Sequence, residues 1–171
     1  GAIQQLDFNV LTVNSNIPYQ NFSIKVTCAN DPLGTLPSEF PTASTPVFSS
    51  SSFTPVVGWN SFPFTTPYNW DGVNGLFVEI CWSNPTASAS DVLEQTLTAS
   101  NTVMYAEGTL NGTTGCSMLY NDIFNITGIS SMRPNTKFTI CPPPPAGYHY
   151  VWTPAANVIA NSNTASPTVT A

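Results

Sequence analysis

Apolar and polar residues alternate along several short stretches, and this alternation limits the possible folds more than any other feature of the chain. In residues 21–28, Phe22, Ile24 and Val26 occupy every second position, with polar residues between them. A period of two places successive side chains on opposite faces of a β-strand, so one face of each such strand is predicted to be buried. The same alternation predicts that further core-facing residues are Cys28, Leu6, Phe8, Val10, Leu76, Val78, Ile80, Trp82, Phe138 and Ile140.

Turn-forming residues separate these stretches, and helix signals are almost absent. Shorter candidate strands are PVFSS, SFTPVVGW, SFPFTT, VLEQTLTA and TVMYAE. Short strands at intervals of about 8–12 residues, divided by Pro, Gly and Asn, are typical of antiparallel sandwiches. The sequence therefore predicts an all-β protein built as an antiparallel β-sandwich, of the jelly-roll or immunoglobulin-like kind.

The composition excludes some partners and favours an extracellular location. Only 7% of the 171 residues are charged, and 3 basic against 9 acidic residues give a net charge of −6. Nucleic-acid binding is not expected, because a groove that follows phosphates needs a positive surface. No apolar run reaches the length of about 18 residues that a membrane-spanning helix requires, so no membrane span is predicted.

The four cysteines point to disulfides instead of a metal site. No C-x-x-C pair occurs and the chain has one histidine, which argues against a zinc site. Disulfides persist in oxidising compartments, so the cysteines also favour secretion or the cell surface. Four cysteines permit three pairings. We predict Cys81 with Cys116, between a strand and a loop, which leaves Cys28 with Cys141.

A proline run divides the chain. Residues 142–147 follow Cys141 as PPPPAG, and consecutive prolines favour a stiff, extended linker. This predicts a sandwich domain over 1–141 and the start of a second β module over 148–171. The second module has candidate strands at 148–152 and 168–170 and is too small to bury a core alone.

Three stretches of the first domain resemble a known family. YQNFSIKVTCAN, FTPVVGWNSFPFTTPYNWDGVNGLFVEICWSN and RPNTKFTIC, spread over residues 1–141, are similar to a repeat-forming β-sandwich domain of large surface adhesins, including gliding-motility adhesins, of gliding bacteria with type IX secretion. The tail YVWTPAANVIANSNTASPTVTA resembles the start of a PKD-type immunoglobulin-like repeat. The resemblance implies adhesion at the bacterial cell surface. It also implies that 1–141 lacks its first strands, which we expect another segment or subunit to supply.

The stretch NWDGVNG is the first candidate site. Asp71 and Gly72 are typical turn residues, because Asp bonds to nearby backbone and Gly accepts positive φ. A calcium site is the functional alternative, with oxygen ligands from Asp71, Asn69 and Asn74. The run lacks the D-x-D-x-D-G pattern of a calcium loop, so a turn is the favoured interpretation.

Aromatic residues supply a second candidate, a stacking surface for sugar rings. We single out Trp70 and Tyr68, whose neighbours Asn69 and Asp71 offer hydrogen bonds to hydroxyls. The structural alternative is that the aromatic side chains belong to the core, as the alternation predicts for Trp82. The other aromatic residues considered are Trp59, Trp152, Tyr19 and Tyr105.

No catalytic arrangement is evident. Glu79 is a lone carboxylate in an apolar strand, expected to face solvent or to pair with Arg133 or Lys137. His149 has no Ser-Asp companion for a triad. Asn21, Asn111 and Asn125 begin N-x-S/T sequons, which mark polar turns as well as glycan acceptors.

These features predict a non-enzymatic adhesin repeat at the cell surface, acting as a stalk or adhesive module of an extracellular fibre. Its expected partners are neighbouring repeats, other surface subunits and surface glycans. No cofactor is required, and calcium is the one candidate. The alternatives are a carbohydrate-binding module of a secreted protein and a strand-exchanging subunit of a surface filament.

Overall fold

The computed structural model describes residues 1–29, 36–41, 45–86, 88–108, 115–120 and 126–141, together with the backbone of 158–160 and 168–169. The chain divides into two compact units, Gly1–Cys141 and Pro142–Ala171. The division falls at the cysteine that precedes the proline run.

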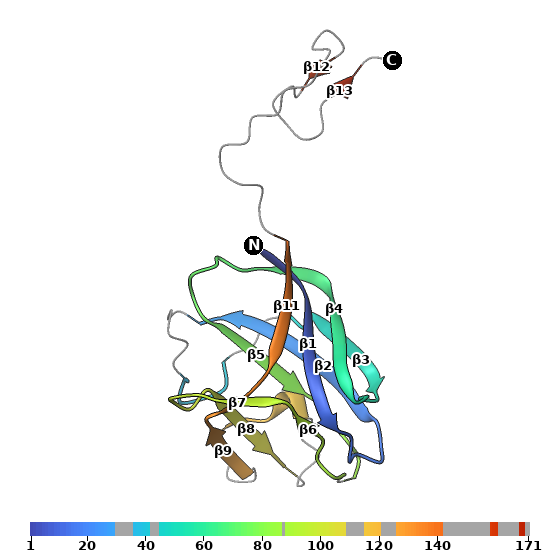
Figure 1. The fold of residues 1–171 in the computed structure, drawn as a ribbon, viewed down its shortest axis with the longest axis vertical. Coiled ribbons are helices and arrows are strands. Elements are labelled where there is room, and N and C mark those ends of the chain that lie inside the picture. Colours follow the sequence, from blue (N-terminus) through green and yellow to red (C-terminus); the bar gives the residue numbers. More distant parts are fainter. Residues whose placement is uncertain are drawn as a thin grey trace. The chain divides into compact units, whose positions relative to one another are not determined.

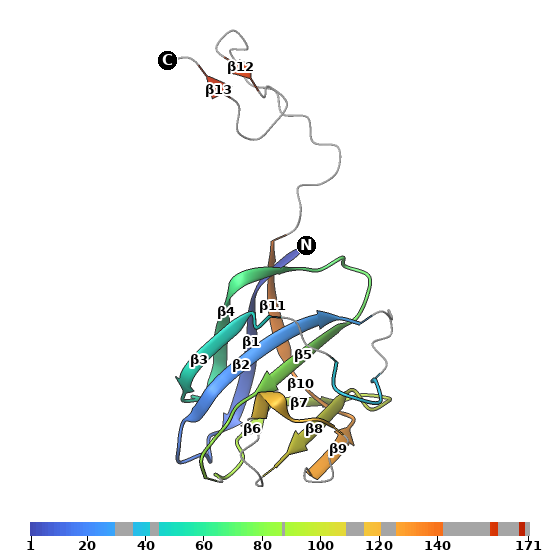
Figure 2. The ribbon, with the colours of Figure 1, turned by 180° about the vertical axis from the view of Figure 1, so that it is seen from behind.

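The first unit is an antiparallel β-sandwich of two sheets, as predicted. Figures 1 and 2 show the sheets as separate layers, with β1 central in one and β2 central in the other. Sheet A contains β11 (Thr136–Cys141), β1 (Ala2–Thr12) and β4 (Gly58–Asn69), with β6 (Val92–Leu93) also paired to β1. Sheet B contains β3 (Phe48–Phe53), β2 (Tyr19–Cys28) and β5 (Leu76–Cys81).

The core lies between the two central strands, and its members confirm the buried faces that the alternation predicts for these strands. Leu6 of β1 and Ile24 and Val26 of β2 are fully buried. The Phe22 ring of β2 stacks on that of Phe62 of β4, with 5.4 Å between ring centroids, so aromatic packing joins the two sheets. Other buried members of this cluster are Phe8 and Val47.

Two predicted core residues are largely exposed. Trp82 has 43% of its surface exposed because β5 ends one residue earlier, at Cys81, and its ring packs beside Tyr19 at a centroid distance of 4.9 Å. Ile140 is 38% exposed because it lies near the end of β11, an outer strand of sheet A. Alternation predicts the direction of a side chain, while the position of its strand in the sheet decides how far the side chain is covered.

The two ends of the sandwich differ. Ala2 pairs with both Cys141 and Asn69, so β1 begins and β11 finishes at one end, which we call the proximal end (Figure 1). β1 then runs to Thr12 at the opposite, distal end, where residues 13–18 connect it to β2.

Asp91 ties the connection between β1 and β2 to the segment before β6. Its carboxylate accepts hydrogen bonds from the backbone of Asn14 and Ser15, both at 2.7 Å, and from the Tyr19 hydroxyl at 2.8 Å. Partial burial acts to raise the pKa of Asp91, but these hydrogen bonds outweigh burial and lower the pKa below its ordinary value. Burial, together with the Asp91 hydrogen bond and charge, raises the pKa of Tyr19 to about 12.

A long two-stranded arm extends the sandwich after β6. β7 (Gln95–Leu97) pairs with β10 (Met132–Pro134), and β8 (Val103–Glu107) pairs with β9 (Ile126–Ser130). The N–H groups of Thr98 and Thr102 donate to the carbonyls of Ser131 and Ser130, so hydrogen bonds link the two pairs where residues 98–102 interrupt the pairing. We call β7, β8, β9 and β10 the arm.

The second unit carries β12 (Val158–Ala160) and β13 (Thr168–Val169), which pair antiparallel. The predicted linker at 142–147 and the predicted strand at 148–152 lie outside the described residues. Across the part of the chain that the structure describes, no helix has the length and apolar character needed to cross a membrane.

Candidate functional site

The structure places the predicted ligand residues at the proximal end, with Tyr68 and Asn69 at the end of β4 and the others in the turn that follows. β4 of sheet A ends at Asn69 and β5 of sheet B begins at Leu76, so the turn carries the chain from one sheet to the other. Trp70 exchanges two backbone hydrogen bonds with Gly1: its N–H donates to the Gly1 carbonyl at 2.9 Å, and its carbonyl accepts from the terminal ammonium at 2.7 Å. The turn is thus fastened to the start of β1.

Asp71 uses both carboxylate oxygens inside this turn. Oδ1 accepts the N–H of Val73 at 2.9 Å and that of Asn74 at 3.0 Å, while Oδ2 accepts the Asn74 side-chain amide at 2.7 Å. The Val73 and Asn74 backbone hydrogen bonds hold the pKa of Asp71 below its ordinary value. Gly72 has a φ of 80°, which a side chain disfavours. The turn interpretation accounts for all of these contacts.

The same geometry gives little support to ligand binding here. The Trp70 indole N–H donates to the Asn74 carbonyl at 2.7 Å, so its polar edge is already engaged. Tyr68 faces the core cluster, and burial raises the pKa of its hydroxyl. Among the described residues, no group of three or more His, Cys, Asp or Glu side chains is placed to hold a metal ion. Calcium at Asp71 and Asn74 stays a prediction.

The outer surface of sheet A carries a second aromatic and polar cluster, which sequence reasoning did not assemble. Trp59 of β4 is 40% exposed, and the Lys137 ammonium from β11 lies 3.4 Å from its ring centroid, a cation–π contact that crosses β1. Beneath it, Asp7 of β1 is only 8% exposed although it points away from the core. We call this cluster the polar face; its members are Trp59, Lys137, Asp7, Ser61, Gln5, Asn9 and Glu94.

Neutral donors satisfy the buried carboxylate of the polar face. Gln5 Nε2 donates to the two Asp7 oxygens at 3.0 and 3.2 Å, and the Ser61 hydroxyl donates to Oδ1. The Asn9 amide donates to Glu94 at 2.9 Å. Asp7 and Ser61 are cross-strand partners, so the register of β1 and β4 brings them together. A single sequence does not reveal register, which is why the cluster was missed.

Glu79 pairs with Lys25, which corrects the predicted pairing with Arg133 or Lys137. The two side chains are cross-strand partners on β5 and β2, and their charged atoms are 2.8 Å apart. Lys137 instead lies on Trp59. The strand order of sheet B, β3-β2-β5, decides the outcome because it places β2 beside β5.

The cysteine predictions are half right. Cys81 and Cys116 form a disulfide, which joins β5 to the short 3-10 turn Gly115–Ser117. Cys28 and Cys141 are both free thiols. Cys28 lies two residues after the buried Val26, so its side chain faces the core. Cys141 pairs with Ala2, the neighbour of the buried Ile3, so its side chain points to the outer surface of sheet A. The two thiols face different surfaces, so the predicted second disulfide is wrong.

The remaining candidates divide between described and undescribed parts of the chain. Asn21, the first sequon residue, is exposed and has a φ of 51° near the start of β2. Asn111, Asn125, His149 and Trp152 lie outside the described residues.

Comparison with known proteins adds no relative. No protein-family model matches the sequence. Searches of curated proteins and of solved structures found no significant match either. The resemblance to adhesin repeats therefore stays a prediction.

Proposed function

We propose that this chain is a non-enzymatic module of an extracellular, cell-surface assembly, and that it serves adhesion. The observation that carries the proposal is the Cys81–Cys116 disulfide, which attaches the segment between β8 and β9 to β5. Such a bond persists in an oxidising compartment. The low content of charged residues and the resemblance to adhesin repeats of gliding bacteria with type IX secretion point the same way.

Within the first unit, the distal connections lie away from the residue that leads into the proline-rich segment. The proline-rich segment continues from Cys141, which lies at the proximal end beside Ala2. The distal connections, at the other end of the same unit, are candidates for contact with a surface. Repeated weak contacts from such modules would gain strength through effective concentration.

The test uses the native protein on intact cells. We expect an antibody against residues 1–141 to label unpermeabilised cells, and non-reducing peptide mapping of the surface protein to recover the Cys81–Cys116 bond. In-frame removal of residues 1–141 from the native protein should reduce attachment to a surface. Detection of the protein only inside cells, with both thiols reduced, would overturn the proposal.

A second candidate, glycan binding, is favoured by the polar face. Trp59 is 40% exposed on a sheet surface, with the Lys137 ammonium on one face of its ring and carboxylate, amide and hydroxyl groups nearby, which suits the apolar and polar sides of a sugar ring. A glycan array should show binding that Trp59→Ala abolishes. Trp70→Ala is the matched control, since the Trp70 indole N–H is engaged within its own turn. Equal loss in both variants, or no binding by the wild type, would exclude this site.

A further inference from the structure

The outer edge of sheet B lacks the features that usually prevent strands from associating. β3 is the edge strand in the order β3-β2-β5, and its residues, FSSSSF, include neither charge nor proline. The other long edge strands of sheets A and B differ: β4 contains Pro63 and Pro67, β11 contains Lys137, and β5 contains Glu79. Charges and prolines on edge strands oppose pairing with another chain. Among the described edge strands of sheets A and B that are longer than two residues, β3 alone has neither.

Because of a local irregularity, the inward and outward side chains of β3 follow the same order from either end of the strand. Phe48 pairs with Ile24 and Ser50 with Phe22, so both face the core. The strands then change phase at Asn21, whose φ is 51°. Beyond it Phe53 again packs on the core, 5.1 Å from the Phe62 ring. Both terminal phenylalanines of β3 therefore face inward although five positions separate them, while Ser49 and Ser52 face outward.

Hydrogen bonds of β2 show which backbone groups of β3 point to the open edge. The Gln20 N–H donates to Asn84 Oδ1 at 2.9 Å, and its carbonyl accepts the Ser83 N–H at 2.8 Å, so both groups point toward the β5 side. Its cross-strand partner Ser52 must then direct its own N–H and C=O away from β2. The Ile24 carbonyl accepts the Val47 N–H at 2.9 Å, so Ile24 directs its backbone groups toward β3, and the preceding residue, Ser23, directs its own toward β5. Ser49, the cross-strand partner of Ser23, therefore also directs its backbone groups to the open edge.

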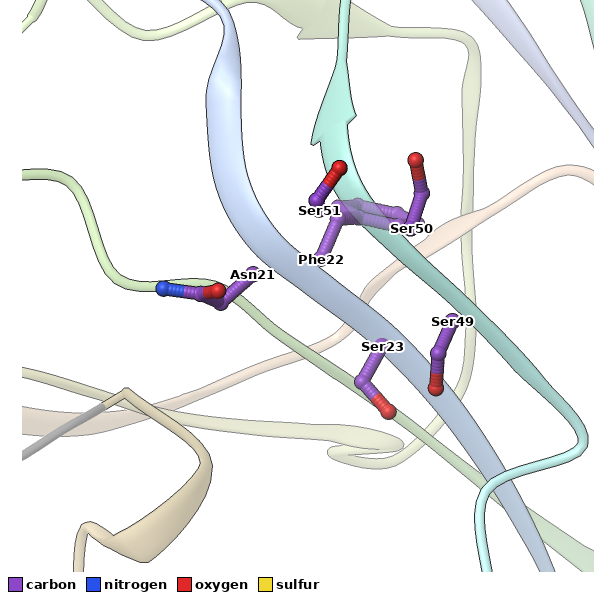
Figure 3. A pocket seen from close by; sticks show the side chains of 6 residues that line it. All are labelled: Asn21, Phe22, Ser23, Ser49, Ser50 and Ser51. Carbon is purple, nitrogen blue, oxygen red and sulfur yellow. The ribbon is translucent and has the colours of Figure 1, made fainter.

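The Ser52 backbone groups at this edge have only a local substitute for a partner strand. The Ser50 hydroxyl donates to the Ser52 carbonyl at 2.7 Å and accepts the Ser52 N–H at 3.4 Å. The second contact is long for a hydrogen bond, so this N–H is weakly satisfied. Figure 3 shows the residues that line a pocket beside it: Asn21, Phe22, Ser23, Ser49, Ser50 and Ser51.

We propose that β3 pairs antiparallel with β3 of a second copy of this chain. The sequence FSSSSF reads the same in both directions, so a twofold axis between Ser50 and Ser51 places like residues opposite one another. Ser49 then lies opposite Ser52 of the second copy, and both direct their backbone groups to the shared edge. Phe48 lies opposite Phe53 of the second copy on the core side. The product is one continuous sheet formed by sheet B of each copy.

The partner is inferred to be a second copy because the β3 edge is complementary to itself. A twofold interface requires one surface to match itself, and a palindromic strand with symmetric facing meets that requirement. The interface is small, because one strand pair buries less than the roughly 1,200 Å² of a stable complex. We therefore expect weak, concentration-dependent dimers that adhesin arrays strengthen through repetition.

Sedimentation velocity on the full 171-residue chain tests the proposal. We expect a monomer at low concentration and a dimer toward about 1 mM, in line with a small interface. Ser51→Lys should abolish the dimer, because residue 51 of each copy lies next to the axis and the two positive charges would repel. Ser100→Lys, an exposed serine outside β3, is the matched control and should dimerise as the wild type does.

A charge-reversed mixture makes the test specific to the proposed symmetry. Ser51→Glu alone should also be monomeric, whereas an equimolar mixture with Ser51→Lys should regain the dimer, because opposite charges then meet at the axis. Thermal melts of each variant establish that it is folded. A monomeric wild type at the highest concentration, an unchanged Ser51→Lys dimer, or a mixture that stays monomeric would each overturn the proposal. None of these results bears on cell-surface location.

Discussion

The sandwich core and the arm are both antiparallel β-structure, yet different forces hold them. The central strands β1 and β2 bury Leu6, Ile24 and Val26 completely between two sheets. The arm leaves most of its large apolar side chains in solvent, including Leu97, Tyr105, Ile126 and Ile129. Its ladder has two strands, which alone are marginally stable in water.

In the arm, whose described residues form no buried core, close contacts at glycines and a disulfide hold the strands. The Tyr105 ring covers Gly128, its cross-strand partner, so closely that an added Cβ at Gly128 would lie 2.4 Å from the Tyr105 hydroxyl. The Cys81–Cys116 disulfide fastens the segment between β8 and β9 to β5. Gly115, beside this bond, lies against the Trp82 carbonyl, where a Cβ would have no room. Burial therefore stabilises the sandwich, while the disulfide and the close approach of Gly115 to the Trp82 backbone position the arm.

The largest expected effect is the loss of stability when a buried side chain of the sandwich is truncated, compared with an exposed one of the arm. Ile24→Ala should lower the free energy of unfolding by about 2–5 kcal/mol, because it removes a fully buried side chain and leaves a cavity. Leu97→Ala in the arm, where the side chain is 71% exposed, should change it by less than about 0.5 kcal/mol. Urea denaturation of both variants gives the comparison. Similar losses would show that the arm shares the core.

Removal of the disulfide comes next. The double variant Cys81→Ser/Cys116→Ser should lose about 2–4 kcal/mol, since the bond closes a loop across 35 residues. The rate of amide hydrogen exchange should increase more in β8 and β9 than in β1 and β2, because the arm lacks a core of its own. Cys28→Ser, a substitution at a free thiol, is the control for loss of a cysteine. Uniform acceleration in all strands would contradict a separately fastened arm.

A smaller, pH-dependent effect belongs to the sandwich. The folded state lowers the pKa of Asp91, so its contribution is present above the unfolded pKa of about 3.9 and is lost as pH falls through the folded pKa. Asp91→Asn should cost about 1 kcal/mol at pH 7, a figure kept low by partial exposure, and should flatten the acid side of the stability profile. Urea midpoints between pH 2 and pH 7 measure both. An unchanged acid limb would remove Asp91 from this role.

The smallest effect concerns the Lys25–Glu79 pair of sheet B. Glu79→Gln should cost less than about 1 kcal/mol, because both side chains retain some contact with water and salt screens the attraction. A double-mutant cycle with Lys25→Met at low and high salt isolates the pair. A coupling energy that does not change with salt would mean that the pair is more thoroughly buried than its exposure indicates.

The alternation in residues 21–28 and around Leu6 was sufficient to predict the class of fold and the faces that β1 and β2 bury, because a period of two is a property of each strand by itself. The Asp71 turn was equally readable, since its hydrogen bonds join residues no more than three positions apart. The Cys81–Cys116 bond was also predicted, from its placement between a strand and a loop.

Tertiary structure alone decided the features that depend on which strands are neighbours and in what register. It exposed Trp82, paired Glu79 with Lys25, separated Cys28 from Cys141 and assembled the polar face around Asp7 from three strands. It also left β3 as the open edge of sheet B. Alternation in one strand carries no information about the strand beside it, so the contacts between strands emerge only when the sheets form.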